Sequence, residues 1–526
     1  MLECSRDSAT SDPAGLVNKV LIANRGEIAV RIIRACRDMG LDAVAVYSES
    51  DRAALHVRYA DEAYLIGPSA PTESYLRIDK IIDVARRSGA DAIHPGYGFL
   101  AENPALARAC RDAGLTFIGP SAEAIELMGS KTEARRAAIA AGVPVVPGTA
   151  EPFGPDVSDD EIAGTAATIG YPLLVKAVAG GGGKGMRVVV EPGELPGALR
   201  GARSEAASSF GDPAIYLERR LARPRHIEIQ LLGDHYGTVV PFVERECSIQ
   251  RRHQKVLEES PSFAVTPALR GVLAASAAAV ARTARYTSAG TIEFLLEEGG
   301  EHFYFLEMNT RLQVEHPITE LVTGLDLVQW QIRIARGERL DLDPSRALTP
   351  HGHAIECRIY AEDPDNDFLP SPGRVLGLRV PAGPGVRRDN GGVTPGLEVP
   401  VYYDPLIAKL TAWGEDREQA IARMVRALGE YEVRGIKTSI PFFRWLLSGA
   451  DFRAGRFDTT YLDAELKNRN GRPFLEFPVA SEETACVAAA IYACERVTSG
   501  KTAALPAAAR ASAWKTQTRI DGLRSS

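Results

Sequence analysis

The sequence predicts a chain of the α/β class with three structured regions, and three observations support this. Residues 20–47 read as strand, helix and strand, with an apolar run, an apolar face at helical spacing and a second apolar run. Residues 291–317 read as two strands joined by a tight turn. From residue 348, the PSPG turn and Gly-Pro repeats predict a β-rich module. The 526 residues suffice for about three domains.

The N-terminal region reads as an open parallel sheet, because strand and helix patterns alternate. Its first turn is Asn-Arg-Gly-Glu at 24–27, and the GxGxxG fingerprint is absent, so we expect no dinucleotide pyrophosphate there. A second unit runs from Ile78 into HPGYGFLAEN, residues 94–103. Open sheets bind ligands at the ends of such strands, but His94 and Tyr97 are equally compatible with simple packing.

A glycine run, residues 180–183, lies between two β-rich stretches and is preceded by Lys176. It is not a Walker A loop, because GKG lacks the following Ser or Thr and no helix follows. Four glycines at a hairpin tip let backbone N–H groups approach phosphate closely. A floppy surface hairpin is the alternative, and acidic residues later in the chain favour phosphate binding.

Polar residues also mark the stretch from 216 to 255. His226, Glu228 and Gln230 alternate with apolar residues, which predicts a half-buried strand whose polar face could simply be wet. Glu218 could accept hydrogen bonds from a base or ribose. Four basic residues follow within five positions and suggest an anion site, although a charge run is usually a solvated face: Arg251, Arg252, His253 and Lys255.

The predicted hairpin at 291–317 carries the strongest signal. A three-residue loop at 299–301 would place Glu293 opposite Glu307 and Glu298 opposite His302. Side chains alternate along a strand, so Asn309 and Arg311 share the face of Glu307. Two opposed carboxylates repel, and a divalent cation with oxygen ligands removes that repulsion. A solvated outer face is the alternative, but the apolar run 303–306 indicates a largely buried strand.

Composition excludes some classes of function. The formal charge is −7 and the pI about 5.9, which gives no support for a nucleic-acid or anionic-membrane partner. No apolar run reaches the roughly 18 to 20 residues that span a bilayer. The seven cysteines are scattered, which fits reduced thiols and a cytoplasmic protein. We expect residues 1–17 to be a disordered arm, 267–289 a structural helix and 461–526 a tail of unknown role.

Seven motifs, taken in order, resemble the biotin carboxylase subunit of the biotin-dependent carboxylases, a family of ATP-grasp enzymes. They are VLIANRGEIA, HPGYGFLAEN, KAVAGGGGKGMR, RHIEIQ, QRRHQKV, EMNTRLQVEHPITE and ECRIYAEDP. The resemblance covers about residues 18–460. It implies a Rossmann-like N-terminal domain (18–130), an ATP-grasp domain (131–347) with a mobile glycine-rich lid at about 147–222, and a β-rich α+β C-terminal domain (348–460).

The resemblance also implies roles for individual residues. The metal ligands for Mg²⁺ or Mn²⁺ would be Glu293, Glu307 and Asn309. The ATP site would comprise Lys131, Lys176, Gly181, Gly182, Gly183, Glu218, Leu221, His226 and His253. Bicarbonate and biotin would meet Lys255, Arg311, Gln313, Val314, Tyr97 and Arg358. Among these, Lys255, Arg311 and Arg358 would be catalytic together with Glu315, the base that deprotonates bicarbonate. The family often has lysine where this chain has Arg219, so the resemblance implies a main-chain contact to adenine at this position and no side-chain contact.

The implied reaction is ATP- and bicarbonate-dependent carboxylation of biotin through carboxyphosphate. No Met-Lys-Met biotinylation triplet occurs, so we expect biotin on a separate carrier protein, with a carboxyltransferase subunit completing the reaction. A homodimer is expected by analogy, and the final acceptor stays open among acyl-CoAs and pyruvate. The rivals are another ATP-grasp ligase, such as a carbamoyl-phosphate synthetase, and a non-catalytic nucleotide-binding scaffold. Lys255, Glu315 and Arg358 together argue against the scaffold.

Overall fold

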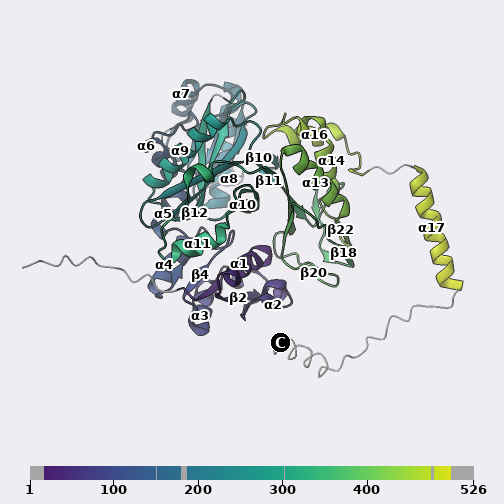
Figure 1. Cartoon of the computed structure of the whole chain (residues 1–526). Helices are drawn as coiled ribbons and strands as arrows, with labels where there is room; N and C mark the ends of the chain where they lie inside the picture. Colours follow the sequence, from purple (N-terminus) through teal and green to yellow (C-terminus); the bar gives the residue numbers. More distant parts are fainter. Residues whose placement is uncertain (1–16, 150, 179–185, 301, 476–478, 499–526) are drawn as a thin grey trace, which may run out of the picture. The chain divides into compact units, whose positions relative to one another are not determined.

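The computed structural model describes residues 17–149, 151–178, 186–300, 302–475 and 479–498 of the chain (Figure 1). The chain divides into two compact units, residues 1–472 and 473–526. In the second unit the described residues include one helix, α17 (Val479–Thr498). None of the helices among the described residues is both long and apolar enough to cross a bilayer.

The N-terminal region contains the predicted parallel sheet, with strand order β3-β2-β1-β4-β5. Apolar side chains of helix α1 (Gly26–Asp38), including Ile28 and Ile32, are buried against this region, which explains their helical spacing. Val17, expected at the end of a disordered arm, is instead fully buried, and its carbonyl accepts hydrogen bonds from Arg336. The strands are β1 (Lys19–Ile22), β2 (Asp42–Ser48), β3 (Glu62–Gly67), β4 (Ala92–His94) and β5 (Thr116–Phe117).

An eight-stranded antiparallel sheet forms the centre of the first unit, in the order β13-β12-β9-β10-β11-β14-β21-β19. It crosses the domain boundary expected at residue 348, because β11 pairs directly with β14. Residues of the central and C-terminal regions therefore lie on one continuous surface. The strands are β9 (Arg225–Gly233), β10 (Val239–Arg251), β11 (Gln254–Ser260), β12 (Ser288–Leu296), β13 (Phe303–Asn309), β14 (His353–Tyr360), β19 (Val386–Asn390) and β21 (Leu406–Gly414).

A smaller sheet, ordered β7-β6-β8, carries the two stretches that flank the glycine run. These stretches are the antiparallel strands β6 (Leu173–Ala177) and β7 (Met186–Val189), as predicted. The glycines 181–183 between them lie outside the described residues. Helices α7 (Asp159–Ile169) and α8 (Leu195–Phe210) bury apolar side chains against this sheet, and β8 is Ile215–Arg219.

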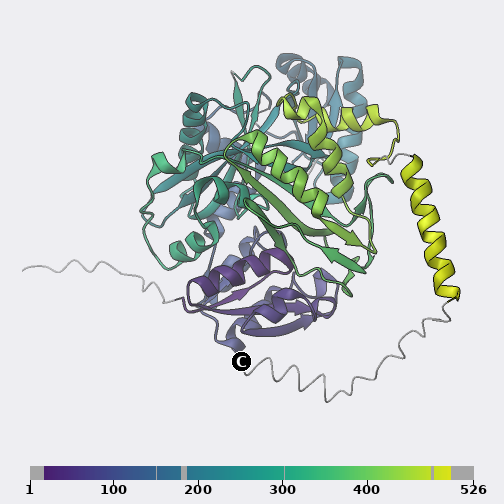
Figure 2. The same ribbon diagram turned by 45° about the vertical axis from the view of Figure 1, so that its right-hand side comes forward.

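The other helices cover the sheets or lead into the site. Helix α13 (Arg417–Glu430) packs on β21 and β14, and α1 lies beside β19, as the purple helix next to the green strands in Figure 2 shows. The expected helix 267–289 is too long: α9 (Pro267–Thr283) ends earlier, and Ser288 and Ala289 begin β12. The remaining helices of eight or more residues are α3 (Ile78–Ser88), α4 (Pro104–Asp112), α5 (Ala122–Gly129), α6 (Lys131–Ala140), α10 (His316–Thr323), α11 (Leu327–Ala335), α14 (Ile440–Ser448) and α16 (Tyr461–Arg469).

Candidate active site

The hairpin of β12 and β13 places Glu293 directly opposite Glu307, as predicted. Burial raises the pKa of Glu307, and the nearby charge of Glu293 raises it further. Asn309 lies two residues along the same strand and donates a hydrogen bond from Nδ2 to Glu293 Oε1 at 2.8 Å. Two carboxylates and an amide oxygen are the hard oxygen donors that Mg²⁺ or Mn²⁺ prefers, so these residues fit a divalent cation.

The register beyond this pair differs from the prediction. Phe294 pairs with Phe305, so β13 contains one extra residue at a bulge next to the Glu293–Glu307 pair. The backbone N–H of Glu297 donates to the carbonyl of His302 at 2.8 Å, so Glu297, and not Glu298, lies opposite His302. A bulge inserts one residue in one strand only, and an alternation count along the sequence does not register it.

Lys255 joins three buried carboxylates at the centre of the site. Its ammonium group donates to Glu228 at 2.6 Å and to Glu293 and Glu315 at 2.8 Å each. Burial would lower the pKa of Lys255, but the three carboxylates outweigh burial and hold that pKa well above its usual value. Lys255 is therefore a fixed positive charge, held at the wall of the site by three carboxylates.

Glu315 is fully buried between two cations. Its Oε1 accepts from Lys255, and its Oε2 accepts from Arg358 at 3.0 Å. Burial favours the protonated form, but Lys255 and Arg358 outweigh burial and hold the pKa of Glu315 well below its usual range. Arg358 Nε also donates to Glu258 at 2.6 Å, and burial raises the pKa of Glu258 to about 7 against the pull of that arginine.

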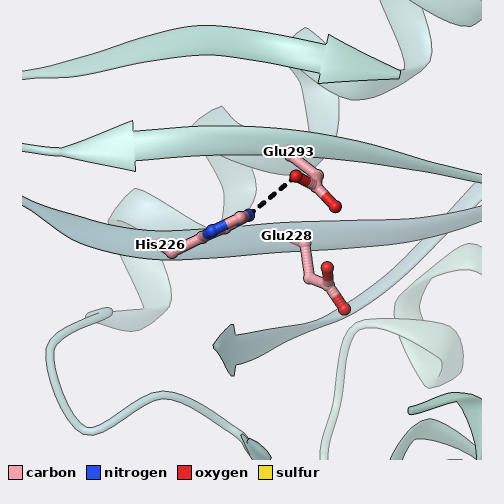
Figure 3. Close-up of side chains that lie close together, drawn as sticks. All are labelled: His226, Glu228 and Glu293. Carbon is pink, nitrogen blue, oxygen red and sulfur yellow. Dashed lines mark ion pairs between the residues drawn. The ribbon is translucent and has the colours of Figure 1, made fainter. Parts of the chain in front are cut away.

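The polar face of β9 is buried, so the interpretation of a wet face was wrong. Glu228 and Gln230 are fully inaccessible, and both bind the buried guanidinium of Arg245, which donates to Gln230 Oε1 at 2.8 Å. Figure 3 shows His226 and Glu228 side by side on one strand and Glu293 on its neighbour. His226 Nε2 lies 2.9 Å from Glu293 Oε2. The alternation along the strand predicted this polar face, but the sequence did not show which elements cover it.

His226, Glu293 and Lys255 line a cavity of about 520 Å³. On one side of it, Lys176 forms an ion pair with Glu218, and Arg135 NH1 lies 3.6 Å from Glu218 Oε1. Burial lowers the pKa of Lys131 on the same wall. The predicted residues that line the cavity are Lys131, Lys176, Glu218, His226, His253, Lys255, Glu293, Glu307, Asn309, Arg311, Gln313, Val314 and Arg358.

The loop after β13 is held by its own polar side chains and by one carboxylate of the N-terminal region. Arg311 donates to Gln313 Oε1 at 3.0 Å, to Asn309 Oδ1 at 3.2 Å and to Glu102 Oε2 at 2.9 Å. Glu102 belongs to the HPGYGFLAEN motif, so this motif fixes the arginine from the N-terminal region. The loop thus presents a guanidinium and an amide beside Lys255.

Some predicted residues lie elsewhere. Tyr97, Leu221 and Glu315 are absent from the described lining of the cavity, but Glu315 accepts hydrogen bonds from Lys255 and Arg358, which both line it. The glycines 181–183 are outside the described residues. The basic run divides: Arg251 pairs with Glu362 and Arg252 with Asp367, while only His253 and Lys255 face the cavity. The run of basic residues in the sequence did not indicate these carboxylate partners, because they lie more than 100 residues away in the chain.

Comparison with known proteins shows which protein family the chain resembles. Three family models match in succession: the biotin carboxylase N-terminal domain at residues 16–125, the carbamoyl-phosphate synthase L chain ATP-binding domain at 130–343, and the biotin carboxylase C-terminal domain at 356–464. The central model covers the region shared with the rival synthetase, and the two flanking models distinguish the chain from it.

The relatives and solved structures agree with this order of domains. The chain is 54% identical over 449 residues to a pyruvate carboxylase subunit of Methanothermobacter thermautotrophicus, covering 85% of this chain and 90% of that protein. It is 50% identical over 448 residues to biotin carboxylase 1 of Bacillus subtilis, covering 85% and 98%.

Two crystal structures superpose over most of the first unit. The biotin carboxylase–ATP-analogue complex of Campylobacter jejuni has a TM-score of 0.82 at 44% identity, covering 86% of this chain and all of that one. The biotin carboxylase domain of Hydrogenobacter thermophilus 2-oxoglutarate carboxylase, with MgADP and bicarbonate, has a TM-score of 0.81 at 46% identity, covering 88% and 99%. With its buried Lys255–Glu315–Arg358 chain beside a carboxylate pair, the protein belongs to the biotin carboxylase family.

Proposed function

We propose that this chain is an ATP-dependent ligase that carboxylates biotin with bicarbonate, as the first half-reaction of a multi-subunit carboxylase. The observation that carries this proposal is the buried sequence of charges from Lys255 through Glu315 to Arg358, at the wall of a cavity that also holds the Glu293–Glu307 pair. It supports two adjoining subsites, one for a nucleotide with its cation and one for a small anion.

The first step forms a bond between a bicarbonate oxygen and the γ-phosphorus of ATP. Glu315 takes the proton of bicarbonate, and Lys255, Arg311 and Gln313 hold the anion in line with the phosphoryl group. ADP leaves, and carboxyphosphate remains. A divalent cation at Glu293, Glu307 and Asn309 would offset charge on the phosphate oxygens. Lys131, Lys176 and His226 would stabilise the same oxygens from the protein.

The second step transfers the carboxyl group. Carboxyphosphate breaks into CO₂ and phosphate, phosphate takes the ureido proton of biotin, and the ureido nitrogen attacks CO₂. Arg358 stabilises the negative charge that develops on the ureido oxygen, because its guanidinium is fixed by Glu258 and Glu315 and points to the cavity. A dry site matters, because water hydrolyses carboxyphosphate.

The partners follow from this half-reaction. We propose that biotin arrives on a separate carrier protein and that a carboxyltransferase subunit passes the carboxyl group to its acceptor. The Methanothermobacter relative is named as one subunit of pyruvate carboxylase, which supports an enzyme built from several chains. The Hydrogenobacter domain was solved as a dimer, which supports a homodimer here. Pyruvate, acyl-CoAs and other acceptors are distinguished by the carboxyltransferase.

The experiment is an omission series on purified protein. ADP release is measured with Mg²⁺, ATP, bicarbonate and free biotin, each omitted in turn. Biotin carboxylation requires that turnover depend on both bicarbonate and biotin. Turnover that depends on ammonia would favour the carbamoyl-phosphate synthetase alternative, and tight ATP binding without turnover would favour the nucleotide-binding scaffold.

A further inference from the structure

Lys409 is a fully buried lysine on β21 that contacts residues from all three regions of the first unit. Its Nζ donates to the backbone carbonyl of Val314 at 2.8 Å. The same Nζ lies 3.2 Å from Glu27 Oε1 and 4.0 Å from Asp389 Oδ2. Burying an ammonium group is costly, and three oxygen partners drawn from distant segments offset that cost only when the segments are held together.

The position of Lys409 ties it to the anion subsite. On β21 it is the cross-strand partner of Arg358, the guanidinium assigned to the ureido oxygen. Val314, whose carbonyl it holds, lies between Gln313 and Glu315. A hydrogen bond to this one carbonyl therefore fixes the backbone from which the amide and the base project.

The N-terminal motifs complete the arrangement. Glu27 belongs to the Asn-Arg-Gly-Glu turn, which lacks the GxGxxG fingerprint, and its carboxylate is buried at the start of α1. The ring of Tyr97 has its centroid 5.7 Å from Lys409 Nζ, within the range of a cation–π contact. Asn24 donates to the carbonyl of Tyr97 at 2.7 Å and so holds the tyrosine loop to the same turn.

We propose that Lys409 is a positioning residue of the carboxylation reaction: it holds the 313–315 loop in the geometry that binds and deprotonates bicarbonate, and Glu27 anchors it from the N-terminal region. This rests on the proposed function. It assigns a further role to the Asn-Arg-Gly-Glu turn and the HPGYG loop, which contact Lys409 through Glu27 and Tyr97. Lys409 acts through Val314 and is not assigned any contact with the reacting atoms.

The test uses the full chain with Lys409→Met, which keeps an unbranched side chain only one atom shorter and removes its charge. Because this leaves Glu27 buried without a cation, the double variant Lys409→Met with Glu27→Gln is measured in parallel. In both, the KM for bicarbonate in biotin-dependent ADP release should rise about tenfold or more, since small misplacements of a reacting group are costly. The KM for ATP should stay within about twofold.

Measurements on two further variants and on the wild type distinguish the possible explanations. Glu27→Gln alone retains the bond from Lys409 to Val314 and should raise the bicarbonate KM less than Lys409→Met does. Lys19→Met removes a lysine that pairs with Glu62 in the N-terminal sheet, and it should change neither KM. Wild-type protein without bicarbonate dependence would refute the proposed function itself.

With wild-type dependence intact, other results overturn the role of Lys409. Equal increases in the KM for ATP and for bicarbonate would assign it to general structure. A double variant whose bicarbonate KM stays within about twofold of wild type would show that the loop holds its geometry without the lysine. A double variant that fails to fold, judged by its thermal melt with and without MgADP, would make Lys409 a folding residue and contradict the proposal.

Discussion

Replacing Glu315 with glutamine tests the proposed base most directly. The amide keeps the shape of the carboxylate and one acceptor oxygen, but it cannot take a proton from bicarbonate. Loss of a positioned general base lowers a rate by about 10²–10⁴-fold. Nucleotide affinity should stay within about twofold, because Glu315 is absent from the described lining of the cavity and is not among the residues assigned to ATP or its cation.

The cost to stability can be worked from the contacts. Glu315 accepts one charge-assisted hydrogen bond from Lys255 and one from Arg358. Glutamine can replace only one of them, so about 1.5–3 kcal/mol is lost. Lys255 retains Glu228 and Glu293, and Arg358 retains Glu258, so no cation is left without a carboxylate. This loss is below the stability of an ordinary folded protein, about 5–15 kcal/mol.

The assay is bicarbonate-dependent ADP release, with MgADP binding measured by titration on the same preparation. Glu259→Gln is the matched control, because Glu259 is a buried carboxylate on β11 that accepts from Arg417 at 2.7 Å, away from the cavity. It should lose comparable stability and keep bicarbonate-dependent turnover. Glu315→Gln with more than about a third of wild-type activity would refute the assignment, as would an equal loss of turnover in the control.

Three further predictions concern the other parts of the site and the fold. Arg358→Lys keeps the charge but loses the planar fork, so biotin-dependent turnover should fall at least tenfold while ATP KM changes less than about twofold; equal losses in both would contradict its role. Glu307→Gln should raise the Mg²⁺ concentration for half-maximal turnover at least tenfold, because losing even a residue that only supports a metal ligand lowers metal affinity about 10–100-fold. The control is Glu298→Gln, an exposed residue of the same hairpin, which should leave that Mg²⁺ concentration unchanged. Burial would raise the pKa of Glu320, but Arg31 and Arg387 outweigh burial and lower this pKa. The stability that Glu320 contributes is therefore present at neutral pH and is lost as the pH falls below about 4.5, the ordinary pKa of a glutamate. The difference in melting temperature between wild type and Glu320→Gln should therefore be largest at pH 7 and shrink below that value, and a difference that grows on acidification would contradict the sign.

The hairpin part of the site could be predicted from sequence because its residues lie close together in the chain. The Glu293–Glu307 pair depends on a single short hairpin, and strand alternation then places Asn309 on the same face. The bulge beside that pair could not be predicted, because it adds a residue without interrupting the apolar pattern. The glycine run was predicted to join two strands, and the flanking strands confirm this.

The tertiary structure alone decided which charges are buried and what they bind. Arg245 and Lys409 are inaccessible cations, and their partners lie on other elements: Glu228 on β9 for Arg245, and Glu27 in the N-terminal region for Lys409. Nothing in the local pattern around either residue distinguishes it from a surface charge, since burial depends on what packs above it. The same reason explains why the domain boundary near 348 is crossed by one sheet: strand pairing between β11 and β14 joins residues about 100 positions apart. Sequence by itself determined the family, the α/β class and the residue types at the centre of the site; tertiary structure determined their charge partners, because these contacts exist only once the three regions are assembled.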